Sequence, residues 1–208
     1  MKNFCDIYDV SRETFDKLKT YQSMLIEWQQ KFNLVSSSTL EDAWNRHFLD
    51  SVQLFKLLPK DAKIMYDFGS GAGFPGMVLA IMANEKMPNL EVNLVESTAK
   101  KTLYLNAVKE QTNAKVNILN NRIEKLPLIK ADVITSRAMA SLNELLGYAI
   151  RFCSKKTICI FPKGKRYAEE LAEAHKHWKF KCQILPSEQS EEGKILIVTD
   201  LTKSKGVK

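Results

Sequence analysis

Four of the chain's eight glycines lie within eight residues, Gly69–Gly76, between an apolar segment and a helical pattern. The preceding residues, 64–68, read IMYDF, which is typical of a buried strand. Glycines allow a tight turn here and let the main chain approach a ligand closely. Pro75 suits the first turn of the following helix, whose free N–H groups face the loop. The segment therefore predicts a strand, a glycine loop and a helix start that bind a nucleotide-like ligand.

The chain beyond residue 63 alternates short apolar runs with helical patterns. The predicted strands are 64–68, 92–95, 116–119, 133–136, 158–161, 182–185 and 195–199, and the predicted helices are about 76–83, 100–111, 142–152 and 167–177. This alternation indicates an α/β protein with a mainly parallel sheet and helices on both faces. Only a loop separates the last two strands, so they are expected to be antiparallel. That combination is typical of Rossmann-like class I methyltransferases.

Residues 1–60 are expected to form an N-terminal helical extension packed on a single domain, 61–208. Ser11 can cap a first helix, since the apolar residues after it recur every three or four positions. Ser38 and Glu41 have the spacing of a capping box for a second helix, which should run to about Leu58.

Composition narrows the function classes. The chain has 31 Lys and Arg against 24 Asp and Glu, a net charge of +7, which suits a polyanionic partner or a solvated surface with a basic tail from about 202. It has no apolar run of membrane-spanning length and no secretory signal. Its four cysteines lack metal-ligand spacing, so we expect reduced thiols, no metal and a cytoplasmic location. No heptad surface argues for an oligomer, so a monomer is expected.

Two carboxylates bear on the choice of ligand. Glu96 ends the second predicted strand, where it can accept both ribose hydroxyls of an adenosine. The glycine pattern and Glu96 fit NAD and S-adenosylmethionine equally well. Asp67, just before the loop, favours the cationic S-adenosylmethionine, because it would repel a pyrophosphate. The alternatives are that Asp67 holds the loop's main chain and that Glu96 stabilises a helix start.

Residues after the third and fourth strands complete the predicted site. Ile123 could pack on an adenine ring, and Glu124 could reach its amino group. Arg137 follows the fourth strand, and strand carboxyl ends face the cleft in open α/β sheets. The alternative interpretations are that Glu124 is a surface acid beside a core isoleucine, Ile123, and that Arg137 is a solvated arginine.

Four segments together closely resemble one family over about Tyr21 to Thr199. They are GSGAGFPG (69–76), ITSRAMASL (134–142), FPKG (161–164) and NRHFLDS (45–51). The chain is similar to the RsmG family, once called glucose-inhibited division protein B. Its members are bacterial methyltransferases that transfer a methyl group from S-adenosylmethionine to guanine N7 in the 530 loop of 16S rRNA.

The resemblance implies roles for particular residues. Besides Asp67, Gly71 and Gly73 of the loop region, it implies cofactor contacts at Gly69, Phe74, Glu96, Ile123, Glu124 and Arg137. The basic positions implied on the RNA side are Arg46, His47, Arg122 and Lys163. Ser70 and Ala72 stand where relatives often have Thr and Pro, and neither change removes a glycine. For His47 the alternative is a neutral imidazole at a packing edge.

The implied reaction needs little chemistry from side chains. Guanine N7 has a lone pair and no proton, so in-line displacement needs no general base and catalysis rests on positioning. Arg137 would then position the guanine or the methionine carboxylate, and Arg122 and Lys163 would hold RNA phosphates. Two other functions stay open: an NAD-dependent oxidoreductase, from the glycine pattern and Glu96, and a non-catalytic, cofactor-sensing RNA-binding module. The expected partner is 16S rRNA or the small ribosomal subunit.

Overall fold

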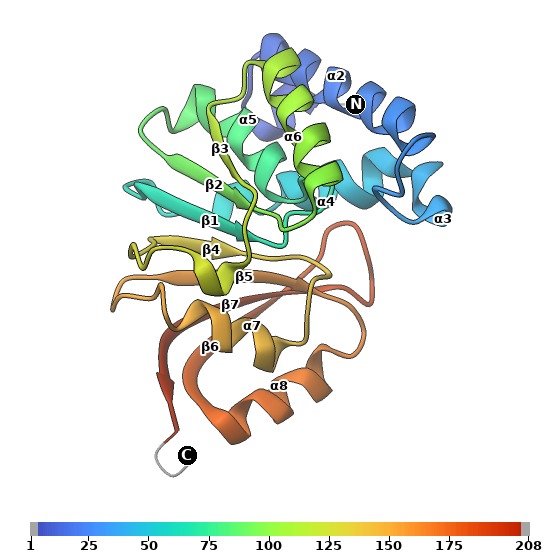
Figure 1. Ribbon diagram of the computed structural model, residues 1–208. Coiled ribbons are helices and arrows are strands. Elements are labelled where there is room, and N and C mark those ends of the chain that lie inside the picture. The colour runs from blue at the N-terminus through green and yellow to red at the C-terminus, as the bar shows by residue number, and fades with distance from the viewer. Residues whose placement is uncertain (1–3, 205–208) are drawn as a thin grey trace.

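A seven-stranded sheet forms the centre of the protein in the computed structural model, which describes residues 4–204 (Figure 1). The strand order is β3-β2-β1-β4-β5-β7-β6. The strands are β1 Ile64–Phe68, β2 Glu91–Val95, β3 Val116–Leu119, β4 Val133–Thr135, β5 Ile158–Lys163, β6 Trp178–Pro186 and β7 Lys194–Lys203. All neighbours are parallel except β7, which is antiparallel to β5 and β6. The predicted sheet type is therefore confirmed.

The last two strands are longer than the sequence indicated. Their cross-strand ladder runs from Pro186 opposite Lys194 to Trp178 opposite Lys203. The extra residues carry few consecutive apolar side chains, so only the main-chain hydrogen bonds reveal that they are strand. The predicted tail from about 202 is wrong for Thr202 and Lys203, which belong to β7. The rest of that predicted tail, 205–208, lies outside the described residues.

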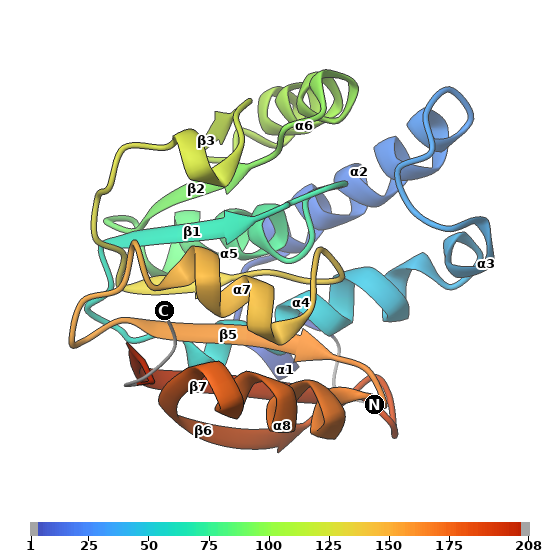
Figure 2. The same cartoon turned by 60° about the horizontal axis from the view of Figure 1, so that its bottom comes forward.

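Helices cover both faces of the sheet. They are α1 Phe4–Tyr8, α2 Arg12–Gln29, α3 Ser37–Leu40, η1 Trp44–Leu49, α4 Asp50–Val52, η2 Phe55–Leu57, α5 Gly76–Lys86, α6 Ala99–Thr112, η3 Ile123–Lys125, α7 Leu142–Ala149 and α8 Tyr167–His177. In Figure 2, α7 lies in front of the sheet and α5 behind it. No helix within residues 4–204 is long and apolar enough to cross a membrane.

Alternation along each strand divides the apolar side chains between two cores. In β1, Met65 packs in the core that α2, α5 and α6 share, whereas Tyr66 and Phe68 pack in the core under α7 and α8. Successive side chains of a strand point to opposite faces, so a strand covered on both sides is apolar throughout. The same alternation places Asp67, next to Phe68, on the α5 side of the sheet.

The first predicted helix of the extension corresponds to α2 and begins where the sequence predicts, whereas the short helix α1 before it was not predicted. The Ser11 hydroxyl accepts a hydrogen bond from the Thr14 amide, which caps α2. Glu85 of α5 joins this cap, because its carboxylate accepts bonds from the Ser11 amide (3.0 Å) and the Thr14 hydroxyl (2.6 Å). The start of α2 is thereby fixed to the end of α5.

The second predicted helix is wrong as a single element. Its first turn, α3, has Ser36 at the N-cap position without a side-chain cap hydrogen bond. Ser38 lies inside this helix and Glu41 at its C-cap, so the predicted Ser38–Glu41 capping box does not form. The chain then continues as a π-helical turn, η1, followed by α4 and η2. Turns of this kind are frequent at functional sites. The spacing of apolar residues predicted which side chains face the core, but it did not predict that the main chain changes from α-helix to a π-helical turn at η1.

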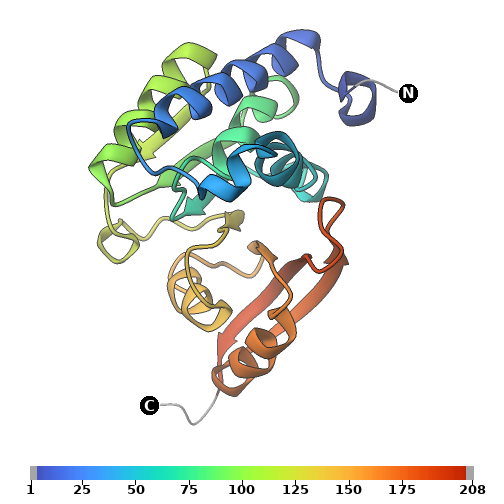
Figure 3. The ribbon, with the colours of Figure 1, turned by 90° about the vertical axis from the view of Figure 1, so that its right-hand side faces the viewer.

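The extension also contacts the loop between β6 and β7, residues 187–193, as Figure 3 shows. The Gln53 side chain accepts a hydrogen bond from the Glu188 amide at 2.8 Å, and Lys56 forms an ion pair with the Glu188 carboxylate. The extension thus touches the glycine-loop side and the C-terminal hairpin of the protein.

Candidate functional site

A cleft of about 1390 Å³ lies where the carboxyl ends of the parallel strands meet the extension. Ligands of open α/β sheets bind at this edge. The cleft exceeds the range of about 300–1,000 Å³ usual for a small-molecule pocket, so it has room for a cofactor and part of a larger substrate. The predicted residues that line it are Arg46, His47, Gly69, Gly71, Phe74, Glu96, Arg122, Ile123, Glu124, Arg137 and Lys163.

Three glycines of the loop adopt a left-handed main-chain conformation. The φ angles are +64° at Gly69, +58° at Gly71 and +98° at Gly73. Gly69 and Gly71 line the cleft, whereas Gly73 does not. A Cβ atom at Gly73 would collide with the hydroxyl of Tyr21. Gly73 therefore allows close packing against α2, and its predicted cofactor contact stays a prediction.

Asp67 does not line the cleft either, and its predicted cofactor contact stays a prediction. Its side chain is fully buried beneath the loop. One carboxylate oxygen accepts a bond from the Thr135 hydroxyl (2.8 Å) and the other from the Gly76 amide (3.2 Å). Burial raises the pKa of Asp67 to about 6, against the opposing effect of these hydrogen bonds. Asp67 thus holds the loop's main chain, which was the alternative interpretation.

Glu96 lies at the edge of the cleft and braces the same loop from the other side. Its carboxylate accepts bonds from the Gly71 amide (2.9 Å) and the Thr98 amide (2.7 Å). A carboxylate offers about four acceptor sites, so Glu96 retains capacity for the hydroxyls of a bound ribose. The open space around Gly71, where a Cβ atom would meet nothing nearer than 3.8 Å, is consistent with a ligand beside it. These features fit a nucleoside group.

Ile123 and Glu124 line the cleft from the short turn η3. Ile123 is buried and Glu124 is exposed. Arg151 fixes the turn, because its guanidinium donates a 3.0 Å bond to the Glu124 carbonyl. Burial, and next the Glu124 carboxylate, raise the pKa of Tyr148, which also lines the cleft.

Arg137 binds the extension through three hydrogen bonds. Its Nη1 donates to the Arg46 carbonyl (2.9 Å) and to the Asp50 carboxylate (3.0 Å), and its Nη2 contacts Nδ1 of His47 (2.8 Å). The guanidinium also lies 5.2 Å from the centre of the Phe74 ring. The bonds use three of its five N–H groups, so part of the guanidinium is available to the cleft. Arg137 is therefore held firmly and is not a solvated arginine.

His47 is buried at the junction of the extension and the glycine loop. Its Nε2 contacts the Thr39 hydroxyl at 2.9 Å, and its ring stacks on Phe74 with the centroids 5.0 Å apart. Burial, and next the charge of Arg137, lower the pKa of His47 to about 4. The imidazole is therefore neutral near pH 7. This arrangement matches the packed, neutral imidazole of the alternative interpretation, and the RNA contact of His47 stays a prediction.

Lys163, which is predicted to hold RNA phosphates, lines the cleft but is paired within the protein, and its RNA contact stays a prediction. Its ammonium donates to the Glu170 carboxylate (2.7 Å) and to the Ala140 carbonyl (2.8 Å), and the side chain is nearly buried. The neighbouring carboxylate compensates the charge, so Lys163 ties the loop after β4 to α8. Arg46 and Arg122, by contrast, are exposed at the cleft, and within residues 4–204 neither side chain forms an ion pair.

Two residues that the sequence analysis did not single out shape the site. Tyr21 donates a hydrogen bond to the Ala72 carbonyl and stacks on Phe74, with ring centroids 5.3 Å apart. Met139 lies against Gly69, where a Cβ atom would collide with the methionine side chain. Tyr21 belongs to the apolar stripe of α2, so its pattern indicated only core. Met139 lies within the ITSRAMASL segment and carried no other signal.

The metal-ligating residue types are dispersed. Among the residues that the structure describes, no three His, Cys, Asp or Glu side chains gather in a way that could hold a metal ion. Cys5, Cys153, Cys159 and Cys182 are all free thiols.

Solved structures of methyltransferases share this fold. An O-methyltransferase from Bacillus cereus in complex with SAH aligns with a TM-score of 0.59 and 13% identity, over 87% of this chain and 91% of its own. A ribosomal protein L11 methylase from Lactobacillus delbrueckii aligns with a TM-score of 0.57 and 13% identity, over 73% of this chain and 76% of its own. These likenesses confirm the predicted Rossmann-like class I methyltransferase fold.

Comparison of sequences identifies the family, whereas the solved structures show only the fold. The ribosomal RNA small subunit methyltransferase G of Rhodospirillum centenum is 41% identical over 199 residues, which cover 96% of this chain and 90% of the relative. The protein of the same description from a Jannaschia species is 42% identical over 187 residues, 90% of this chain and 89% of the relative. The family described as GidB, rRNA small subunit methyltransferase G, matches residues 14–194. This chain therefore belongs to the rRNA small subunit methyltransferase G family.

Proposed function

We propose that this protein transfers a methyl group from S-adenosylmethionine to guanine N7 in the 530 loop of 16S rRNA. The observation that carries the proposal is the match to the methyltransferase G family over most of the chain. The cleft supports it, because the glycine loop, Glu96 and η3 surround a space larger than a nucleoside needs.

The residues at the cleft suit the methyl donor. The main chain at Gly69 and Gly71 can approach its methionine part, and the Glu96 carboxylate can accept its ribose hydroxyls. Ile123 offers an apolar surface for adenine, and Glu124 an acceptor for its amino group. When bound, S-adenosylmethionine supplies a methyl group activated by a sulfonium.

Guanine N7 suits the side chains available. This atom carries a lone pair and no proton, so its methylation needs no base on the protein. His47 is buried and its Nδ1 is occupied by Arg137, and Asp67 is enclosed below the loop, so neither is placed to take a proton from a substrate. The protein's contribution is then orientation of N7 toward the methyl group, with in-line displacement as the proposed step.

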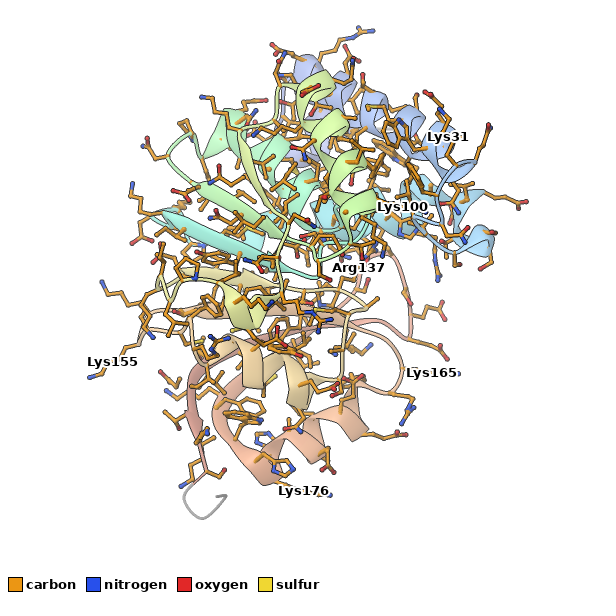
Figure 4. All side chains as sticks on the ribbon, viewed as in Figure 1. Lys31, Lys100, Arg137, Lys155, Lys165 and Lys176 are labelled. Atoms are coloured by element: carbon orange, nitrogen blue, oxygen red, sulfur yellow. The ribbon has the colours of Figure 1, made fainter. Side chains whose placement is uncertain are left out.

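The exposed cations at the cleft suit an RNA backbone. Arg46 and Arg122 line the cleft with their side chains in solvent, and Lys101 lies beside them. In Figure 4, Arg137 lies near the centre of the view, Lys31, Lys100 and Lys165 lie to its right, and Lys155 lies at the left edge. Phosphate contacts of this kind supply affinity and orientation without reading sequence. The proposed partner is 16S rRNA or the small ribosomal subunit.

The proposal is tested by incubating the protein with labelled S-adenosylmethionine and small subunits from a strain that lacks the enzyme. We expect one label, on a guanine of the 530 loop, at N7. Label on an adenine or a pyrimidine would overturn the substrate assignment. RNA affinity without transferred label would instead indicate a non-catalytic binding module. Equilibrium binding of S-adenosylhomocysteine and of NAD is measured in parallel, and preference for NAD would indicate an oxidoreductase.

A further inference from the structure

The guanidinium of Arg137 is oriented by groups that all come from the N-terminal extension. Arg46 offers a carbonyl, Asp50 a carboxylate and His47 a ring nitrogen, and all three lie within 3.0 Å of a guanidinium nitrogen. Asp50 compensates the charge, because it forms the ion pair with Arg137. The Arg46 carbonyl and the His47 ring nitrogen are neutral acceptors, so they orient the guanidinium of Arg137 rather than compensate its charge.

We propose that His47 is a positioning residue for the methyl transfer: its neutral imidazole accepts a hydrogen bond from Arg137 and fixes the plane of that guanidinium at the cleft. The inference rests on the proposed function for the reaction, but its structural part, the direction of the hydrogen bond, can be measured separately. His47 acts through Arg137 and touches no reacting atom in this scheme.

The hydrogen-bond pattern determines which imidazole nitrogen carries the proton. A guanidinium can only donate, so Nδ1 of His47 must be the acceptor. In a neutral imidazole the other nitrogen then carries the hydrogen, so Nε2 donates to the Thr39 hydroxyl. Protonation would place a second donor against the guanidinium. Thr39 therefore selects the tautomer that Arg137 requires.

Hydrogen bonds fix the position of the imidazole proton, and stacking on Phe74 fixes the orientation of the imidazole ring. The His47 ring lies at 24° to the Phe74 ring, and the Arg137 guanidinium packs over the same Phe74 ring. Phe74 belongs to the glycine loop, so the imidazole, the guanidinium and the loop share one contact surface. The π-helical turn η1 supplies both His47 and the Arg46 carbonyl to this surface. A displacement of the imidazole would therefore move Arg137 relative to the glycine loop.

The discriminating variants are His47→Asn and His47→Leu, which have side chains of similar size. The amide oxygen of asparagine can accept the bond from Arg137, and leucine cannot. We expect His47→Asn to retain at least roughly tenfold more kcat/KM toward small subunits than His47→Leu, because a small misplacement of a positioning group has large effects on rate. A purely structural role predicts the reverse or no difference, since leucine suits a buried position at least as well. Equal rates for two folded variants would overturn the proposal.

A double-mutant comparison checks that His47 acts through Arg137. In an Arg137→Ala background, exchanging His47 for Leu should change kcat/KM by less than about twofold, because the group being positioned is gone. A full additional loss would show that His47 acts by another route and would contradict the inference. If His47→Leu does not fold, Thr39→Val replaces it, because that variant leaves the imidazole in place and removes the acceptor of the Nε2 hydrogen bond, together with the hydroxyl's own bond to the Ser36 carbonyl.

A readout independent of activity is the nitrogen NMR spectrum of His47 at pH 7. We expect one neutral tautomer with the hydrogen on Nε2, and a shift toward mixed tautomers in Thr39→Val. A hydrogen on Nδ1 would overturn the inference whatever the enzyme's activity. If the spectrum is as expected but wild-type protein transfers no label to small subunits, the proposed function fails while the hydrogen-bond assignment stands.

Discussion

The hydroxyl of Tyr21 donates a hydrogen bond to the carbonyl oxygen of Ala72 in the glycine loop. The two residues are 51 positions apart, and Tyr21 belongs to α2 of the N-terminal extension. The same ring stacks on Phe74 and makes an edge contact with Phe48. The extension is therefore part of the wall that shapes the loop, rather than a separate helical attachment.

Replacing Tyr21 by Phe removes this hydrogen bond but keeps the ring. The Ala72 carbonyl then loses the partner that Tyr21 supplies, so we expect the free energy of unfolding to fall by about 1–3 kcal/mol. Affinity for S-adenosylhomocysteine should fall too, because the loop is less firmly held. Denaturant unfolding and calorimetric binding measure the two effects.

Tyr104→Phe is the matched control. Tyr104 lies in the same aromatic cluster, with its ring 6.4 Å from that of Tyr21, and its buried hydroxyl has no hydrogen-bond partner among residues 4–204. Removing an unpartnered buried hydroxyl should leave stability unchanged or raise it. Equal destabilisation by the two variants would show that the Tyr21 effect comes from the ring environment and not from the bond to Ala72.

Alanine substitutions at Gly69 and Gly71 distinguish main-chain strain from a steric clash of the added methyl group. Both have φ near +60°, so an alanine at either position adds a strain of about 1–2 kcal/mol. Only at Gly69 would the new methyl group also collide with Met139. We therefore expect Gly69→Ala to lose more stability than Gly71→Ala in denaturant unfolding. Adding Met139→Ala should recover the Gly69 variant toward the Gly71 variant, and no recovery would argue against the steric contact.

Glu85 predicts a specific pH dependence of stability. Hydrogen bonds from Thr14 and Ser11, acting against burial, lower the pKa of this carboxyl to about 2 from an ordinary 4.5. A folded-state pKa below the unfolded value means that the contribution is complete above pH 4.5 and is lost as pH falls toward 2. The difference in unfolding free energy between wild type and Glu85→Gln should therefore shrink over that range. Glu173→Gln, on the exposed face of α8, is the control and should show a smaller pH dependence.

Replacing Arg122 and replacing Lys163 are expected to have different effects on RNA binding. Arg122→Ala should weaken binding to small-subunit RNA and reduce the slope of log affinity against log salt by about one unit, as expected for one lost phosphate contact. Lys163→Met should leave that slope unchanged, because the ammonium is already paired with Glu170. Its effect should appear in thermal stability instead. A reduced slope for Lys163→Met would mean that this ion pair opens when RNA binds.

The regular elements follow from local pattern. The strand β1 and the helix α8 begin and end where the sequence predicts, because β1 is a short apolar run and α8 has a clear polar and apolar face. Between residues 37 and 57 the pattern was misleading. A helical stripe was present, but the main chain changes pitch at η1, where Arg46 and His47 contact Arg137. Those contacts join segments about 90 residues apart, and no local propensity encodes them.

The sequence by itself determined the order of the strands and of the longer helices beyond residue 63, the position of the glycine loop and the residue types around the cleft. Only the tertiary structure decided which of those side chains are available to a ligand. Asp67 and Lys163 lie at the carboxyl ends of β1 and β5, much as Glu96 and Arg122 lie just beyond β2 and β3. The first two are nevertheless paired inside the protein, with Thr135 and Glu170. The physical reason is that a charged group's role depends on desolvation and on its partners. Those partners lie on other elements, and only folding brings them within hydrogen-bonding distance.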